Sequence, residues 1–167
     1  MLIYHPAFDI YHGAFRLLRL LEALPRTAVE VDRLRILDFY LLFPALLREV
    51  RFPIGEAGAK NYFKKLPPPY EEIDDPKALF MRLEPLQRAA LEGLAASALI
   101  HGELLQQDKV QRSDVGLPVQ LHDAIVARNR NSKEVQFLTG PLYKLDLYGK
   151  SGLKQRSDLF EHRYDPA

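Results

Sequence analysis

Apolar residues between Val31 and Val50 follow the spacing of one helical face. They recur in steps of three and four, which places them side by side on a helix, at Ile36, Phe39, Tyr40, Phe43, Leu46, Leu47 and Val50. Four further leucines widen this face until charge remains only at the helix ends and on one narrow edge. A helix so apolar has to be buried against several others. We therefore predict a central helix, with a kink or break around Phe43, because Pro44 removes a backbone donor and clashes with the preceding turn.

A second helical pattern precedes the central one. Its apolar positions follow the helical period at Phe8, Tyr11, Phe15 and Leu18. We predict a helix from Asp9 to about Leu24, with Asp9 as the capping residue and Pro25 ending it. The alternation of Val29, Glu30 and Val31 then suits a brief strand or an extended entry into the central helix.

The segment from Arg51 to Tyr70 is the least regular part of the chain, because it is interrupted by glycines and prolines. We predict a loop with one short helix over Ala59–Leu66, followed by a stiff polyproline spacer at residues 67–69. The length of 167 residues suits one helical domain, 1–167. Within this domain we expect two sub-parts, 1–66 and 75–167, joined by a proline-rich linker at residues 67–74.

Helical patterns dominate the second half as well. Asp75 and Pro76 together are a typical helix start, and Pro85 predicts an interruption between a short helix ending near Leu83 and a longer one reaching about Gln107. The longer helix contains the small-residue run AALEGLAASA, which we expect to lie against the central helix or against a partner chain.

Two more helices and a tail complete the predicted chain. Pro118 opens a helix from Val119 to about Asn129, and Ser132 begins another that extends to about Tyr148 with a break at Gly140 and Pro141. Residues 159–165 alternate between apolar and polar side chains, which predicts an extended tail or an edge strand. The fold class is therefore mainly α: a compact multi-helix domain around a central apolar helix, with a small extended or β element at the C-terminus.

Composition narrows the function classes. The net charge of +1 provides no overall field that would recruit DNA or an acidic membrane. The absence of cysteine excludes disulfides, thiolate zinc sites and a cysteine nucleophile, and it fits a reducing compartment. The N-terminus lacks a signal-peptide pattern, and the longest apolar stretch, Leu86 to Ile100, is interrupted by polar residues. We expect a cytoplasmic protein without a membrane span.

Motifs that carry catalytic chemistry are absent from the sequence. The five histidines show no metal-ligand spacing, and neither a phosphate-binding glycine loop nor a GxSxG motif occurs. The sequence GKSG at residues 149–152 lacks the upstream glycine and the buried strand of a phosphate-binding loop. We therefore predict a protein that is not an enzyme and that uses no cofactor or metal; a small enzyme of unrecognised type is the minor alternative.

Basic residues gather in the last third of the chain. The candidates for contact with nucleic acid, or with an acidic partner through paired hydrogen bonds, are Arg128, Arg130, Lys133, Lys150, Lys154 and Arg156. Aspartates and glutamates are interspersed among them, so a solvated surface of mixed charge is the commoner explanation for such a pattern.

Three stretches together resemble a known family. They are YHPAFDIYHGAFRLLRLLE at residues 4–22, VDRLRILDFYLLFPALL at residues 31–47 and GKSGLKQRSDLFEHRYD at residues 149–165. Their order resembles the small middle component of bacterial three-component systems built around an ABC-type, SMC/Rad50-like ATPase. Among such components, the three stretches resemble the small accessory subunit of Lamassu anti-phage systems.

The resemblance implies a non-catalytic accessory subunit of an SMC-like antiviral defence complex. Such a subunit binds the head region of the coiled-coil ATPase and an effector nuclease, and it helps keep the effector inactive until foreign DNA is sensed. Direct contact with DNA stays open. The alternative from another class is a winged-helix-like DNA-binding regulator, in which the helix after Pro118 would have to read the bases, because the central helix is too apolar.

Overall fold

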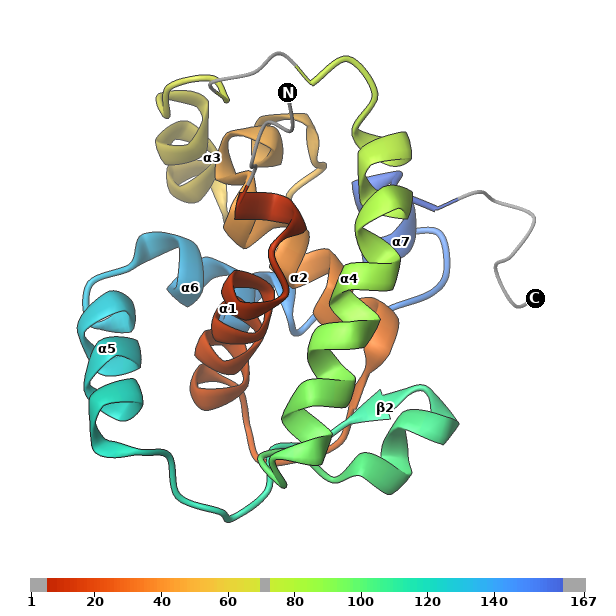
Figure 1. Cartoon of the computed structure of the whole chain (residues 1–167). Helices are drawn as coiled ribbons and strands as arrows, with labels where there is room; N and C mark the ends of the chain where they lie inside the picture. The colour runs from red at the N-terminus through yellow and green to blue at the C-terminus, as the bar shows by residue number, and fades with distance from the viewer. Residues whose placement is uncertain (1–5, 70–72, 161–167) are drawn as a thin grey trace, which may run out of the picture.

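The structure is a computed structural model that describes residues 6–69 and 73–160. It is mainly helical, with one pair of short strands among the described residues (Figure 1). The α-helices are α1 (Ile10–Ala23), α2 (Val31–Leu42), α3 (Ala57–Lys64), α4 (Pro76–Ala96), α5 (Val119–Asn129), α6 (Lys133–Phe137) and α7 (Leu153–Ser157). Shorter 3₁₀ segments cover Pro6–Phe8, Pro44–Glu49 and Gly102–Gln107. The predicted mainly α fold is confirmed.

Helix α2 is the buried centre of the molecule, as its apolar pattern predicts. Phe39 is fully buried and meets the rings of Tyr40, Phe43 and Phe80 edge-on at centroid distances of 5.4, 5.4 and 5.6 Å. The helix ends at Leu42 with Phe43 as its C-cap, and Pro44 starts a 3₁₀ segment. The predicted break is therefore confirmed, and its cause is the missing N–H of Pro44.

The charged edge of α2 is buried with the apolar face. Asp38 is fully buried and receives two hydrogen bonds from Arg16 of α1, at 2.8 and 3.1 Å, and one from Gln87 of α4, at 2.9 Å. Arg35 donates to Gln87 at 3.0 Å and to Asp32 at 3.1 Å. Burial lowers the pKa of the Arg35 guanidinium. This polar network joins α1, α2 and α4, so the edge that interrupts the apolar pattern is an internal junction.

Helix α4 differs from the prediction in two ways. It runs through Pro85 without interruption and ends at Ala96, so the predicted break near Leu83 and the end near Gln107 are both wrong. Pro85 lies on the exposed side, and buried residues before and after it keep the helix on the core. The left-handed conformation of Ala98, at φ 59°, then turns the chain away. The small-residue run packs mainly against α1, where Gly13 approaches Ala90.

The sheet joins two distant parts of the chain. Strands β1 (Val29–Glu30) and β2 (Lys109–Val110) pair antiparallel, with Val29 opposite Val110. The brief strand predicted at Val29 is confirmed, although Val31 already begins α2. Most of the extended element predicted at residues 159–165 lies outside the described residues, which end at Phe160.

The helix predicted from Ser132 to Tyr148 is shorter than expected. Ser132 caps α6, with its hydroxyl accepting from the Val135 N–H at 3.1 Å. The chain continues through a wider π-helical turn, Leu138–Leu142, which accommodates Pro141 and ends the helical run at Tyr143. In the described part of the chain, no helix is both long and apolar enough to cross a bilayer.

Candidate functional site: the exposed helix α5 and its groove

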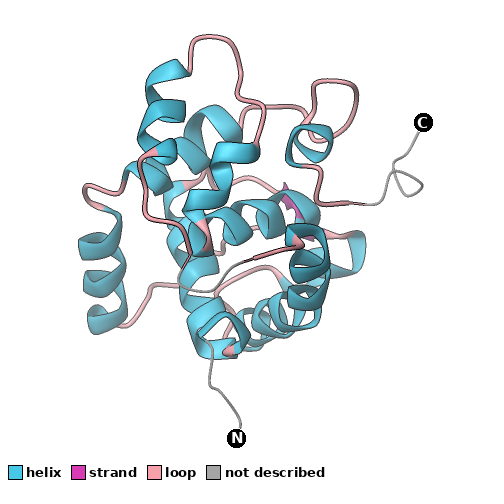
Figure 2. Cartoon of the chain, turned by 90° about the horizontal axis from the view of Figure 1, so that it is seen from above, coloured by secondary structure: helices cyan, strands magenta, loops and turns pink. Residues whose placement is uncertain are grey.

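Helix α5 stands at the edge of the molecule in both views (Figures 1 and 2). Of its eleven residues, all of them described, Ile125 alone is buried. Leu121 and Asn129 are half-buried, and the other side chains are exposed to solvent. Apolar burial normally fixes a helix on its domain, because short helices are only marginally stable by themselves. Other contacts must therefore hold α5 in place.

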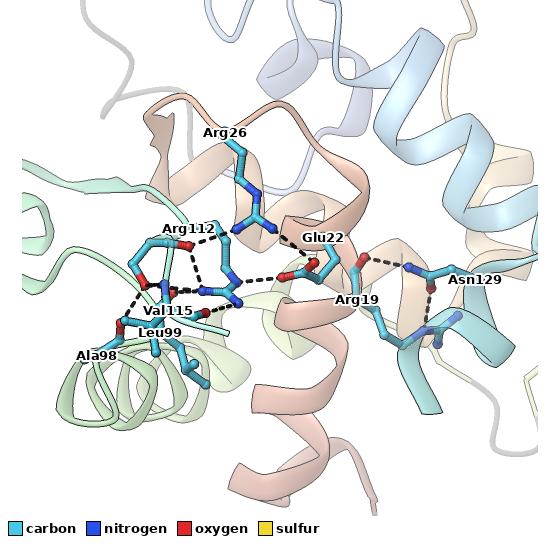
Figure 3. Close-up of polar contacts among 9 residues, drawn as sticks. Arg19, Glu22, Arg26, Ala98, Leu99, Arg112, Val115 and Asn129 are labelled. Carbon is cyan, nitrogen blue, oxygen red and sulfur yellow. Dashed lines mark hydrogen bonds and ion pairs between the residues drawn. The ribbon is translucent and has the colours of Figure 1, made fainter. Parts of the chain in front are cut away.

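The C-terminal end of α5 is held by Arg19 of α1. The Arg19 Nε donates to the Asn129 side-chain oxygen at 3.0 Å, and the Asn129 amide donates back to the Arg19 carbonyl at 2.9 Å (Figure 3). Arg19 also reaches the carbonyl of Arg128 at 3.4 Å. Burial, and then the charge of Arg128, lower the pKa of Arg19. This reciprocal pair fixes the last turn of α5 against the middle of α1.

The loop that leads into α5 is held by Arg112. This arginine is 4% exposed, and its Nε donates to Glu22 of α1 at 2.6 Å. Its two terminal nitrogens donate to the carbonyls of Leu99, Ser113 and Val115, each at 2.8 Å (Figure 3). Arg26 adds bonds to Glu22 at 3.2 Å and to the Ser113 carbonyl at 2.9 Å. Buried charge-assisted bonds of this kind are strong and directional, so they fix the loop at Ser113 and Val115, a few residues before α5 begins.

A groove of about 340 Å³ lies between the end of α1 and α5. Its apolar lining comes from Ala23, Leu117, Ile125 and Val126, and its polar lining from Glu22, His122, Asn129 and Arg130. Two of these polar groups already have partners inside the protein, since Glu22 pairs with Arg112 and Arg26 while Asn129 pairs with Arg19. The groove therefore offers an apolar floor and the guanidinium of Arg130.

The six basic residues proposed from the sequence do not form one surface. Arg128, Arg130 and Lys133 lie close together, exposed where α5 gives way to α6. Lys133 sits over the ring of Tyr62 at 4.9 Å. Lys150, Lys154 and Arg156 lie in or beside α7, which Figure 1 shows on the other side of the molecule from α5.

The side chains of Lys154 and Arg156 bind other groups of the same chain, whereas Lys150 is exposed to solvent. Lys154 is 6% exposed, its ammonium lies 2.9 Å from Asp32 of α2, and it sits over the rings of Tyr148 and Phe160. Arg156 donates to the carbonyls of Ser151 and Arg51, at 2.6 and 3.0 Å. In this structure Lys154 therefore joins α7 to the central helix.

A second cavity, of about 370 Å³, lies beside the strand pair. Two of its charged groups pair with each other, since Arg33 donates to Glu30 at 2.8 Å, and Arg33 also donates to the carbonyls of Tyr143 and Leu145. The hydrogen bond from Arg33 lowers the pKa of Glu30. Among the described residues, no group of three or more histidine, aspartate or glutamate side chains is placed to hold a metal ion.

The residues that position α5 were not predicted from the sequence. Arg112 and Glu22 are 90 residues apart, and Arg19 and Asn129 are 110 apart. Nothing in their local sequence distinguishes them from solvated charges, because only the tertiary fold brings them together. The one local signal in this region is Pro118, which correctly predicts that a helix begins at Val119.

Comparison with known proteins finds one family. The family model described as "ABC-three component (ABC-3C) system Middle Component 5" matches residues 2–165. No curated protein and no solved structure matches the chain.

Proposed function

The chain belongs to the Middle Component 5 family of ABC-three component systems, and from this we propose that it is a non-catalytic accessory subunit of such a system. ABC-three component systems are based on an ABC-type ATPase, so an ATPase component is the first expected partner. This agrees with the resemblance of three stretches of the chain to such middle components.

The observation that supports the proposal is the exposure of α5 at the edge of the molecule. The helix buries one residue, Ile125. Its last turn is bonded to the half-buried Arg19 of α1, and the loop before it is held by the buried Arg112, which pairs with Glu22 of α1. A protein gains little stability from a helix presented in this way, whereas a binding partner gains a rigid, preorganised surface. We infer that α5 is an attachment surface for another component of the system.

We further propose that the system is an anti-phage defence complex of the Lamassu type. In this proposal the subunit binds the head region of an SMC-like ATPase and an effector nuclease, and it restrains the nuclease until foreign DNA is sensed. The support is the resemblance of residues 4–22, 31–47 and 149–165. These stretches contribute α1, α2 and α7, which the Arg16–Asp38 and Lys154–Asp32 pairs hold together.

The alternative of a winged-helix-like DNA-binding regulator has less support. Its favourable feature is the exposed basic group at Arg128, Arg130 and Lys133. A winged helix also needs a β element after its recognition helix, and within residues 6–69 and 73–160 the strands lie before α5. We therefore place partner binding first.

Co-expression with the genes of the ATPase and the third component tests the proposal. We expect a stable complex in size-exclusion chromatography with light scattering, and no ATP or DNA hydrolysis by the chain alone. A chain that elutes as a monomer and binds neither component, under conditions in which those two are folded, would contradict the accessory role. Loss of nuclease restraint when this chain is omitted would support the finer proposal.

A further inference from the structure

One face of α5 combines exposed apolar side chains with a cation. Val119 is 72% exposed and Val126 is 39% exposed. Val119, His122, Val126 and Arg130 follow steps of three and four residues, so they lie along one side of the helix. Of these, His122, Val126 and Arg130 line the groove between α5 and α1. An exposed apolar stripe on a rigid helix marks an interaction site more than a solvated surface does.

The two charged side chains that line this groove differ in how they are paired. In the part of the chain that the structure describes, the Arg130 guanidinium forms no ion pair, whereas the Glu22 carboxylate in the same groove is held by two arginines. His122 is turned to its neighbour Asp123, at 3.3 Å. A guanidinium beside an apolar floor suits a carboxylate, which it can bind through two parallel hydrogen bonds.

We propose that this groove binds an amphipathic helix of another component of the same system, one that carries a carboxylate beside its apolar face. This inference rests on the proposed function and names the surface and the chemistry of the partner. A large apolar side chain of that helix fills the groove, and the carboxylate pairs with Arg130. The volume of about 340 Å³ is near the lower end of the roughly 300–1,000 Å³ typical of binding pockets, which suits an anchoring side chain.

DNA is the weaker candidate for the same groove. Half of the residues that line the groove are apolar, and among them Arg130 alone carries a fixed positive charge. A phosphate backbone would leave the apolar floor exposed, and phosphate binding depends on clustered cations.

Charge reversal at two positions of one helix tests the proposal. The affinity of the full chain for the co-expressed ATPase and third component is measured by biolayer interferometry. We expect Arg130→Glu and Val126→Asp to weaken binding at least about tenfold. Arg128→Glu is the matched control, because Arg128 has the same charge and lies two positions away, outside the groove lining; we expect less than about a threefold change there.

Circular dichroism melting of every variant checks that it is folded. Val119→Asp is a second substitution of an apolar residue, at a more exposed position than Val126. A carboxylate-to-lysine change in the partner that restores binding to Arg130→Glu would identify the ion pair. If the wild-type chain binds, and Arg130→Glu and Arg128→Glu weaken binding equally or not at all, the groove is not the docking site, although the proposed function stands. If the wild-type chain binds neither component, both fail. Salt-sensitive binding of a DNA duplex that both reversals abolish would also overturn the groove proposal.

Discussion

At the scale of single residues, Arg16 and Asp38 form a buried ion pair between α1 and α2. The two side chains share two hydrogen bonds, and the Asp38 side chain is fully buried. A buried ion pair does not stabilise a fold greatly by itself, because both ions lose their hydration. Removing one partner is costly, however, because the other is left buried and uncompensated.

We therefore predict a large loss of stability for Asp38→Ala. The free energy of unfolding should fall by about 3–5 kcal/mol, because Arg16 and Gln87 lose their shared acceptor. Urea unfolding followed by circular dichroism measures this change. Asp123→Ala is the control, since the Asp123 side chain is 71% exposed, and its effect should stay within about 0.5 kcal/mol. Equal effects of the two substitutions would show that the Arg16–Asp38 pair is not the buried junction described above.

Gly152 is a second residue at which the structure leaves no room for a larger side chain. A Cβ at this position would lie 2.2 Å from the carbonyl oxygen of Tyr148, which is a backbone atom and cannot swing aside. We predict that Gly152→Ala lowers the free energy of unfolding by about 3 kcal/mol, because α7 has to move off the core. Thermal melting measures the loss. Gly93→Ala is the matched control on the exposed side of α4, where nothing lies within 4 Å, and it should raise stability by about 0.5–1 kcal/mol.

At the scale of elements, the sequence predicted what local chemistry decides. Asp9 caps α1, accepting from the His12 N–H at 3.0 Å, and Asp75 caps α4 in the same way. Pro44 ends α2, and Pro118 precedes α5. Such signals act within a turn or two of the chain, so the pattern alone carries them.

Tertiary packing decided what the sequence could not predict. The buried face of α4 overrides Pro85, although proline costs a helix roughly 3 kcal/mol. Of the six basic residues predicted from the sequence to contact nucleic acid or an acidic partner, Arg130 alone lines the groove at α5, while Lys154 is buried beside Asp32; their contact role stays a prediction. The groove depends on ion pairs between residues about ninety positions apart, and no local pattern reports them.

The anchoring of α5 leads to a prediction at this scale. Asn129→Ala removes the reciprocal bonds with Arg19 and should cost about 1–3 kcal/mol, concentrated in α5. Hydrogen exchange followed by mass spectrometry should show exchange about tenfold faster in residues 119–129, with α2 and α4 unchanged. The exposed Asn131→Ala is the control. Uniform acceleration across the whole chain would mean that α5 does not open separately.

At the scale of the whole molecule, contacts repeatedly cross the proline-rich segment at residues 67–74. Arg16 and Asp38 before it meet Gln87 after it. Strand β1 pairs with β2, Arg33 holds the carbonyl of Tyr143, and Lys154 reaches back to Asp32. The hydrophobic core likewise draws on both sides of the segment, from Leu17 in α1 to Leu153 in α7. The two sub-parts expected from the sequence thus share their polar junctions and their core.

We therefore propose that residues 1–66 and 75–167 fold as one cooperative unit, and we predict a single unfolding transition. Urea curves from far-ultraviolet circular dichroism and from tyrosine fluorescence should coincide, because neither part keeps its core without the other. A protease site placed at residues 67–69 provides a second test. After cleavage the two pieces should remain associated, and each piece expressed alone should lack a cooperative melt. Two separate transitions, or a folded piece in isolation, would contradict the single cooperative unit and would place the groove between two independently folding parts, because α1 lines one side of it and α5 the other.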